Sequence, residues 1–429
     1  MLANDFHASE VAPMLPRWSH SRVAPSNVQW APVATALIWI TLSSLPSQVQ
    51  LGSVSLSAVL TLGGAFILLL AIPAVLHDRL GPASRLRRDA HPILPMPLGI
   101  LAVLITASLL LHPSMSGLQN WAVYVAFIVT ILSVGTLWRS MDIYRAFRHL
   151  RMVGACVASL SLLLEILSLP MYLPRPFAIE ALVILAMVIP GKPENRLIRY
   201  APYICVVAIT LSLSRTATVI ALVALVFVVL RGRSGVRFIR ALFALLAVAG
   251  GGWLLVSRYP PLRERFLGGD AAVSYGGLSF NTSGRGNIWG LLEAKFFDGG
   301  PFGHGIGAAA DLVSARYPDV AQPHNEYLRL LYDLGWPGLL MFVIGYVLLL
   351  IRCFKRAIQS DDSIHWSATI ALGGTAAIAY TDNPFIYPFV MIPLAVVVGL
   401  SLSRPHQSRM AAASVSDSLT SPGRSSAGV

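Results

Sequence analysis

Long apolar runs, each ended by a turn signal or a charged residue, recur along almost the whole chain. A helix needs about 20 apolar residues to cross the hydrocarbon core of a bilayer, so runs close to that length indicate membrane spans. The pattern therefore predicts an all-α polytopic membrane protein with about 12 transmembrane helices. We place these spans at 31–46, 54–76, 92–111, 120–138, 152–169, 178–190, 200–213, 216–230, 241–257, 336–351, 365–380 and 385–403.

One stretch allows two interpretations. From Tyr200 to Leu230 the chain is apolar apart from Arg215. A single helix of about 31 residues would be about 46 Å long, whereas the hydrocarbon core is about 30 Å thick. A single span would also move every later loop to the opposite side of the membrane, against the distribution of basic residues described next. We therefore expect two helices with Arg215 at the turn between them.

Lysine and arginine are concentrated in every second loop between these spans. The basic residues of these loops are Arg79, Arg85, Arg87, Arg88, Arg139, Arg145, Arg148, Arg151, Lys192, Arg196, Arg199, Arg231, Arg233, Arg237, Arg240, Arg352, Lys355 and Arg356. The intervening short connections at 46–53, 112–118 and 381–384 hold none, and the connection at 170–177 holds only Arg175. Because cytoplasmic loops carry the excess of Lys and Arg, both ends of the chain are expected in the cytoplasm.

These assignments divide the chain into five regions. They are a disordered cytoplasmic tail at 1–30, nine transmembrane helices in 31–257, a large extracytoplasmic loop with its re-entry at 258–335, three transmembrane helices in 336–403 and a second disordered cytoplasmic tail at 404–429. The large loop is rich in glycine and far longer than a plain connector, which indicates a functional element. Two amphipathic helices are expected within it, near 288–297 and 307–315.

Composition supports the membrane assignment. Apolar residues make up 55% of the 429-residue chain, charged residues 12%, and the mean hydropathy is +0.67. A soluble protein has about 25% charged residues, so a soluble fold is excluded. The net charge of +12 is explained by the basic residues of the cytoplasmic loops, so no nucleic-acid partner is expected. The cysteines Cys156, Cys205 and Cys353 lie in or beside apolar runs without metal-type spacing, which supports neither disulfides nor zinc.

Two arginines in or beside the outer face are candidates for anion binding. A charge beside a membrane span is costly and is therefore a candidate functional residue. Arg215 lies in Leu213-Ser214-Arg215-Thr216-Ala217, and its planar guanidinium suits phosphate or carboxylate. The alternative is an arginine that only marks a turn. Arg285 lies between two glycines ahead of a helix-like run, a setting that suits an anion.

Two histidines of the large loop are candidates for proton transfer or substrate contact. His324, followed by Asn325 and Glu326, lies where the loop re-enters the membrane. An imidazole with a pKa near neutrality is a natural general base for a sugar hydroxyl, and a helix-capping role beside Asn325 is the alternative. His304 lies among glycines that indicate a tight backbone path.

Two further outer charges have open interpretations. Arg175, with Glu165 and Glu180 near it in sequence, is either a substrate contact or a member of a structural ion-pair cluster. Asp382 is the only charge in its connection and either orients a histidine or arginine or caps the last helix. No DxD-type metal signature lies in an outer loop, so no metal or cofactor is expected.

These motifs together resemble the O-antigen ligase and polysaccharide polymerase superfamily, the WaaL/Wzy-type membrane glycosyltransferases. The ligase pattern His-Asn-x9-Gly-x2-Gly is met by His324-Asn325 with Gly335 and Gly338. The Ser-Arg-Thr turn at 214–216 resembles the arginine at the outer end of a mid-chain span in that family. Ser-Gly-Arg at 283–285 and the glycine-rich segment 301–307 resemble its large periplasmic loop. The resemblance covers about residues 150–400.

The resemblance implies a GT-C-like fold and a metal-independent, inverting glycosyl transfer on the outer face of the bacterial inner membrane. The donor would be a glycan on undecaprenyl diphosphate, and the acceptor a second glycan or the lipid A core. Arg215 and Arg285 would hold the diphosphate, His324 would deprotonate or orient the acceptor hydroxyl, and Arg175 matches the family only loosely. Asn325, Glu326, His304 and Asp382 are expected to line the substrate site.

Four activities remain open at this level. A polymerase and a ligase share the donor and differ in the acceptor, and the His-Asn-Glu-Tyr-Leu and Thr-Asp-Asn segments favour a polymerase. A protein oligosaccharyltransferase is more distant. A flippase or other transporter would place charges near the midplane, whereas the candidate charges here gather on one face. Membrane lipid and a chain-length regulator protein are the further partners expected.

Overall fold

The computed structural model describes residues 94–137, 143–169, 173–230, 284–318, 320 and 322–403, with short stretches between 40 and 64 and between 250 and 280. The predicted spans at 31–46, 54–76 and 241–257 and both tails lie largely or wholly outside the described residues.

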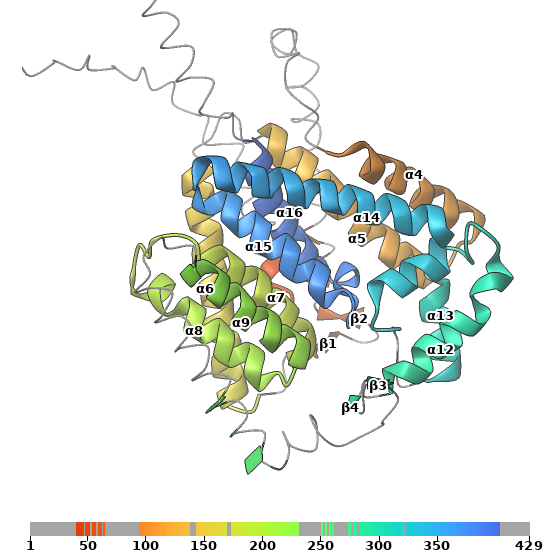
Figure 1. The fold of residues 1–429 in the computed structure, drawn as a ribbon, viewed down its shortest axis with the longest axis horizontal. Coiled ribbons are helices and arrows are strands. Elements are labelled where there is room, and N and C mark those ends of the chain that lie inside the picture. Colours follow the sequence, from red (N-terminus) through yellow and green to blue (C-terminus); the bar gives the residue numbers. More distant parts are fainter. Residues whose placement is uncertain are drawn as a thin grey trace, which may run out of the picture.

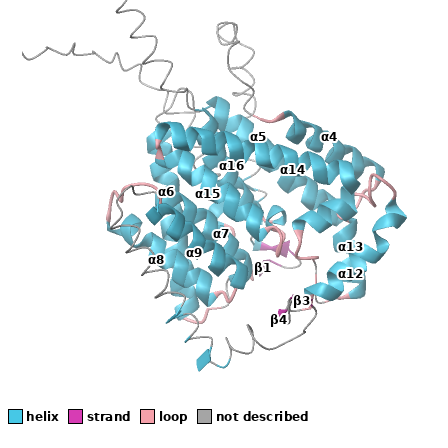
Figure 2. Ribbon diagram, in the orientation of Figure 1, coloured by secondary structure: helices cyan, strands magenta, loops and turns pink. Residues whose placement is uncertain are grey.

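The described chain is almost entirely helical (Figures 1 and 2). The only strands in these ranges form two short antiparallel hairpins, β1 (Gln50–Leu51) with β2 (Val54–Ser55) and β3 (Val273–Tyr275) with β4 (Leu278–Phe280). The helices are α4 (Met96–Leu111), α5 (Met115–Leu137), α6 (Ile143–Ile166), α7 (Pro174–Val188), α8 (Arg196–Leu211), α9 (Arg215–Leu230), α12 (Arg285–Lys295), α13 (Ala308–Arg316), α14 (Glu326–Ser360), α15 (Ser363–Ile378) and α16 (Pro388–Ser403), with short 3₁₀ helices η4 (Phe296–Gly299) and η5 (Pro384–Ile386).

Three of these helices are long and apolar enough to cross a bilayer. They are found at Met115–Val134, Ile143–Ile166 and Glu326–Ser360. Met96–Leu111, Arg215–Phe227 and Pro388–Ser403 are apolar but shorter. The prediction of a helical membrane protein is therefore confirmed, whereas the count of about 12 spans remains a prediction.

The apolar stretch around Arg215 forms two helices, as expected from its length. Helix α8 ends at Leu211 and α9 begins at Arg215. Between them, Leu213 has a positive φ of 58°, and the Ser214 amide donates to the Ser212 hydroxyl at 3.2 Å. The two predicted loop helices are also present, as α12 and α13.

The helices form two groups that meet along α15 and α16 (Figure 1). Helix α16 packs along α5, and α14 packs between α4 and α15. Helix α15 in turn packs against α7 and α9, which lie with α6 and α8 in the second group. Helices α12 and α13 lie beside the N-terminal part of α14, where Gly335 interrupts the helical backbone with a φ of 64°.

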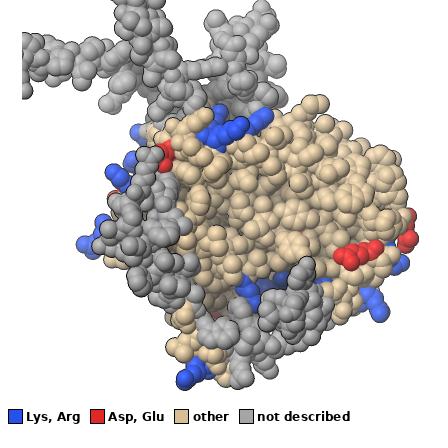
Figure 3. Space-filling model, viewed as in Figure 1, with Lys and Arg blue, Asp and Glu red and all other residues tan. Residues whose placement is uncertain are grey.

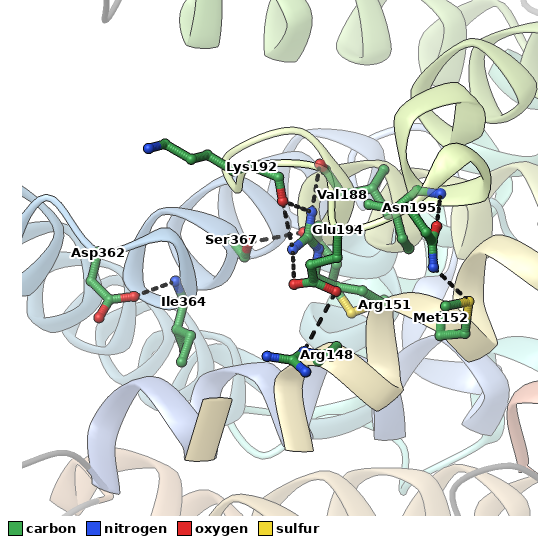
Figure 4. Close-up of polar contacts among 12 residues, drawn as sticks. Arg148, Arg151, Met152, Val188, Lys192, Glu194, Asn195, Asp362, Ile364 and Ser367 are labelled. Carbon is green, nitrogen blue, oxygen red and sulfur yellow. Dashed lines mark hydrogen bonds and ion pairs between the residues drawn. The ribbon is translucent and has the colours of Figure 1, made fainter. Parts of the chain in front are cut away.

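One end of the bundle is rich in arginine. Figure 4 shows Arg151 of α6 beside the turn that joins α7 to α8. Its guanidinium lies 3.0 Å from the Glu194 carboxylate and 3.4 Å from the carbonyl oxygens of Val188 and Lys192. Contacts of Tyr144 with Asp362 and of Arg356 with the Ser401 carbonyl join the ends of α14, α15 and α16 to α6 at this level. We call this region the arginine-rich end.

The opposite end carries the candidate residues. Along α14 it is separated from the arginine-rich end by a stretch without charged side chains, which we call the uncharged belt. In α14 no charged residue lies between Asp333 and Arg352. That stretch of helix is about 27 Å long, close to the thickness of a hydrocarbon core. Figure 3 shows the same pattern as a broad face without Lys, Arg, Asp or Glu, with charges gathered at its edges.

Candidate active site

His324 and Asp382 form the centre of the candidate site. His324 precedes the first residue of α14 by two positions, and Asp382 lies in the turn between α15 and η5. His324 Nδ1 is 3.3 Å from Asp382 Oδ1, and the two side chains are 27% and 11% exposed. When Nδ1 carries the proton and donates to the Asp382 carboxylate, Nε2 keeps a free lone pair. A general base needs such a lone pair to accept a proton. The structure therefore joins two candidates that lie 58 residues apart in sequence.

The backbone of His324 has an unusual conformation. Its φ is +54°, in the left-handed region that few residues other than glycine adopt. Histidine tolerates this region better than most residues, and such conformations gather at functional sites. Asn325 follows in an extended conformation and caps α14, its Oδ1 accepting from the Leu328 amide at 3.0 Å. The left-handed turn and the cap together fix the position of His324 relative to the start of α14.

Arg285 lies beside this pair. It is the first residue of α12, is half-buried and follows Gly284, whose φ is +80°. One turn later, the Trp289 indole N–H donates to the Pro323 carbonyl at 2.9 Å, and its ring meets Tyr380 edge to face at 5.9 Å. The start of α12 is thereby held against the residue before His324 and against the turn that carries Asp382.

His324 and Arg285 influence the pKa of Asp382. Burial raises the pKa of Asp382. The hydrogen bond and charge of His324, the Asn383 amide and the charge of Arg285 together lower this pKa by more than burial raises it. The net pKa lies below the ordinary range for aspartate. Asp382 therefore remains a carboxylate at neutral pH and pairs with a donor at His324 Nδ1.

This shift predicts how stability depends on pH. Because the folded-state pKa of Asp382 is depressed, its ionised form contributes stability above the unfolded-state pKa of about 3.9, and that contribution is lost as pH falls further. We expect Asp382→Asn to be less stable than the wild type by about 1 kcal/mol at pH 6–8, with the difference shrinking below about pH 4. Thermal unfolding of the detergent-solubilised protein at pH 7, 5 and 3 measures this. A difference that grows as the pH falls would contradict it.

Arg215 lies at the same end of the bundle. Phe227 of α9 contacts Trp366 of α15 at 5.4 Å, and Ile220 lies 3.4 Å from the position of a Cβ on Gly374, so the two helices are antiparallel. Continuing this register places Arg215 level with Ala379, whose carbonyl oxygen accepts from the Glu326 amide at 2.8 Å. Arg215 is half-buried at this level. The helix packing thus puts Arg215 at the end of the bundle where the turn after α15 carries Asp382.

Arg175 and Glu180 do not form the ion pair considered from the sequence. Both lie in α7, five residues apart, where Arg175 is exposed and Glu180 is fully buried. Residues five apart on an α-helix face different sides. Because Val188 at the other end of α7 contacts Arg151, Arg175 lies at the end of the bundle opposite the arginine-rich end.

The expectation that Glu326 lines the substrate site is wrong. Its side chain is fully buried, and its carboxylate accepts from the Tyr124 hydroxyl and pairs with Arg329. The second carboxylate oxygen accepts from Asn383 Nδ2 at 3.2 Å. A carboxylate engaged on both oxygens and closed off from solvent holds the protein together at this point and does not face a substrate.

His304 contacts α14 and none of the residues at the centre of the site. Its ring stacks on Tyr332 at 4.0 Å, and its amide donates to the Tyr332 carbonyl oxygen at 3.0 Å. The tight path predicted from its glycines is present, because a Cβ on Gly303 would lie 2.6 Å from that oxygen. Asp333 completes the attachment by accepting from the amides of Gly307 and Ala309. The glycine-rich segment thus anchors α13 to α14.

Three further residues of this region, Tyr124, Arg329 and Asn383, are not among the candidates predicted from the sequence. All are nearly or fully buried around Glu326. Arg329 had a local signal, because Glu326 and Arg329 are three residues apart and lie on one helix face. Tyr124 and Asn383 come from α5 and from the turn after α15, and nothing in the sequence connects them to Glu326.

About a third of the chain matches a model of a known protein family. Residues 203–343 match the family model described as O-antigen ligase. The matched region contains Arg215, Arg285 and His324, whereas Asp382 and Arg175 lie outside it. No curated protein matches the chain.

Proposed function

Since its match to the O-antigen ligase model assigns this chain to the O-antigen ligase and polysaccharide polymerase superfamily, we propose that it joins lipid-linked oligosaccharide repeat units into a surface polysaccharide. The donor is a glycan on undecaprenyl diphosphate, and the transfer is inverting and metal-independent. The observation that carries this proposal is the convergence of His324, Asp382 and Arg285 at the end of the bundle opposite the arginine-rich end.

The roles of the residues follow from the charge that moves during the reaction. His324 Nε2 takes the proton of the acceptor hydroxyl, while Asp382 holds Nδ1–H and stabilises the imidazolium that forms. The hydroxyl oxygen bonds to C1 of the donor sugar, the bond from C1 to the diphosphate oxygen breaks, and the configuration at C1 inverts. The lipid diphosphate leaves with an added negative charge, which Arg215 and Arg285 neutralise. Guanidinium groups fixed in place favour this transition state over the ground state.

The location proposed is the bacterial inner membrane, with about 12 spans and the site on the periplasmic face. The supporting observation is that basic residues gather at the end opposite the site, as cytoplasmic ends do. Membrane lipid surrounds the uncharged belt, and the acceptor and donor approach from the outer leaflet. A chain-length regulator is a further proposed partner.

A ligase that transfers the glycan to the lipid A core is the second candidate. The description of the matched family favours it, whereas the resemblance of the His-Asn-Glu-Tyr-Leu and Thr-Asp-Asn segments favours a polymerase. Purified protein supplied with the lipid-linked donor alone distinguishes the two. A polymerase forms a ladder of longer lipid-linked glycans, and a ligase forms none until lipid A core is added.

Removing either arginine tests the proposed transfer. We expect Arg215→Ala and Arg285→Ala each to lower transfer by about 10²–10³-fold, because each removes a stabilising group from the leaving diphosphate. In a deletion strain, single lipid-linked repeat units should accumulate on the outer leaflet. Arg148→Ala, at an exposed arginine of the opposite end, is the control and should sustain normal glycan. Accumulation on the inner leaflet would instead indicate a transporter.

Cysteine labelling tests the orientation. In a cysteine-free background, Phe297→Cys in η4 and Lys192→Cys in the turn before α8 introduce thiols at two exposed positions near opposite ends. A membrane-impermeant maleimide added to intact spheroplasts is expected to label position 297 and to reach position 192 only after lysis. The reverse pattern would put the site in the cytosol and rule out the proposal.

A further inference from the structure

The two parts of the chain that carry His324 and Asp382 are joined by Glu326. Its backbone amide donates to the Ala379 carbonyl oxygen at 2.8 Å, which ties the start of α14 to the end of α15. Its Oε2 accepts from Asn383 Nδ2 at 3.2 Å, which ties it to the turn before η5. Both Glu326 and Asn383 are fully buried. We call Glu326 with Asn383 the buried junction.

The surroundings hold the junction rigidly. The other oxygen of Glu326 contacts the Tyr124 hydroxyl and the Arg329 guanidinium. The Tyr124 ring in turn stacks on Phe385, two residues beyond Asn383, at 5.0 Å between centroids. Arg329 supplies the positive charge that a buried carboxylate requires. Helices α5 and α14 and the segment at 383–385 are therefore fixed to one another at this carboxylate.

The junction continues directly into the His324–Asp382 pair. The Asn383 amide donates to Asp382 Oδ1 at 2.8 Å, and this is the oxygen that His324 Nδ1 faces at 3.3 Å. A partly exposed ion pair contributes only about 0–1 kcal/mol and does not fix its own geometry. His324 also has a left-handed backbone that its surroundings must maintain. The groups that maintain the alignment therefore lie outside the pair.

We propose that Glu326 and Asn383 are positioning residues, which hold the Asp382 carboxylate in line with His324 Nδ1 and thereby direct Nε2 toward the acceptor hydroxyl. This inference rests on the proposed function, because it assigns His324 the role of base. Neither residue touches a substrate. They affect the rate of the chemical step. They do not affect binding of the donor, because Arg215 and Arg285 bind its diphosphate.

Asn383→Ala tests the inference, because it removes the bond to Glu326 and keeps the backbone amide that Asp382 uses. With purified full-length protein and a lipid-diphosphate-linked glycan donor, we expect kcat to fall about 10-fold and the KM for donor to stay within about twofold. Ser401→Ala, which removes a buried hydroxyl that bonds to His365 at 2.8 Å at the arginine-rich end, is the control and should keep kcat. If Asn383→Ala does not fold, Asn383→Ser replaces it, since serine is too short to reach Glu326.

A double-mutant cycle separates positioning from a general loss of structure. In the His324→Ala background, Asn383→Ala should cause no further loss, because the group that it aligns is absent. An equal loss in both backgrounds, an unchanged kcat or a change in KM alone would overturn the inference while leaving the proposed function intact. Full activity of His324→Ala by itself would overturn the proposed function, and the inference with it.

Discussion

Replacing His324 with alanine is expected to lower kcat for glycosyl transfer by about 10²–10⁴-fold, the range that a positioned general base contributes. The acceptor hydroxyl would then lose its proton only to water, while Arg215 and Arg285 would still hold the donor. The KM for donor should therefore change little. Release of lipid diphosphate from a lipid-linked glycan, followed with the purified protein, measures both constants.

His324→Asn separates the loss of the base from a loss of fold. Asparagine tolerates the left-handed conformation found at this position, where φ is +54°. It should therefore keep the turn into α14 and still lack a group that accepts the proton at neutral pH. His149→Ala, at an exposed histidine of α6 toward the arginine-rich end, is the matched control and should transfer normally. Wild-type rates in His324→Asn would show that no proton passes through this imidazole.

Replacing Arg329 with methionine is expected to destabilise the protein by about 3–5 kcal/mol. Methionine fills a similar volume but leaves Glu326 and Asp333, both fully buried, without the cation between them. Removing one partner of a buried ion pair lowers the free energy of unfolding by more than the intact pair contributes to it, because an uncompensated charge remains buried. The expected observations are a lower midpoint of thermal unfolding in detergent and a lower yield of monodisperse protein.

Lys355→Met is the matched control for this substitution. Lys355 lies on the same helix, α14, but is exposed at the arginine-rich end. Its loss should change stability by no more than about 0.5 kcal/mol, as exposed substitutions do. The double variant Glu326→Gln with Arg329→Met should recover part of the loss, because it also removes a buried negative charge. An Arg329→Met protein as stable as the wild type would contradict the role assigned to this cation.

The helices could be predicted from the sequence because burial in an apolar medium depends on the local run of side chains. The predicted runs at 92–111, 120–138 and 365–380 each correspond to one helix, and the break at Arg215 follows from the length that a bilayer allows. Two boundaries differ by about ten residues. The run predicted at 152–169 belongs to α6, which begins nine residues earlier at Ile143. The run predicted at 336–351 belongs to α14, which begins ten residues earlier at Glu326, because the polar first turns are buried against α5 and the turn after α15.

Of the residues selected from the sequence, some lie together at the candidate site and one is buried in the interior. His324, Arg285 and Asp382 could be selected because charged and imidazole groups are rare in such a chain and lie at the ends of apolar runs. Glu326 was selected on the same grounds but lies in the interior. A sequence shows which residues are costly to bury, and it does not show which of them find a buried partner.

The sequence by itself determined the helical membrane fold and the concentration of Lys and Arg in every second loop, and it was enough to select His324, Arg215 and Arg285 as candidates. These depend on composition and on spacing within one run of chain. Only the tertiary structure decided that Asp382 meets His324 and that Tyr124 and Asn383 meet Glu326, at separations of 58, 202 and 57 residues. Contacts over such distances depend on how α5, α14 and α15 pack, and that is a property of the whole bundle.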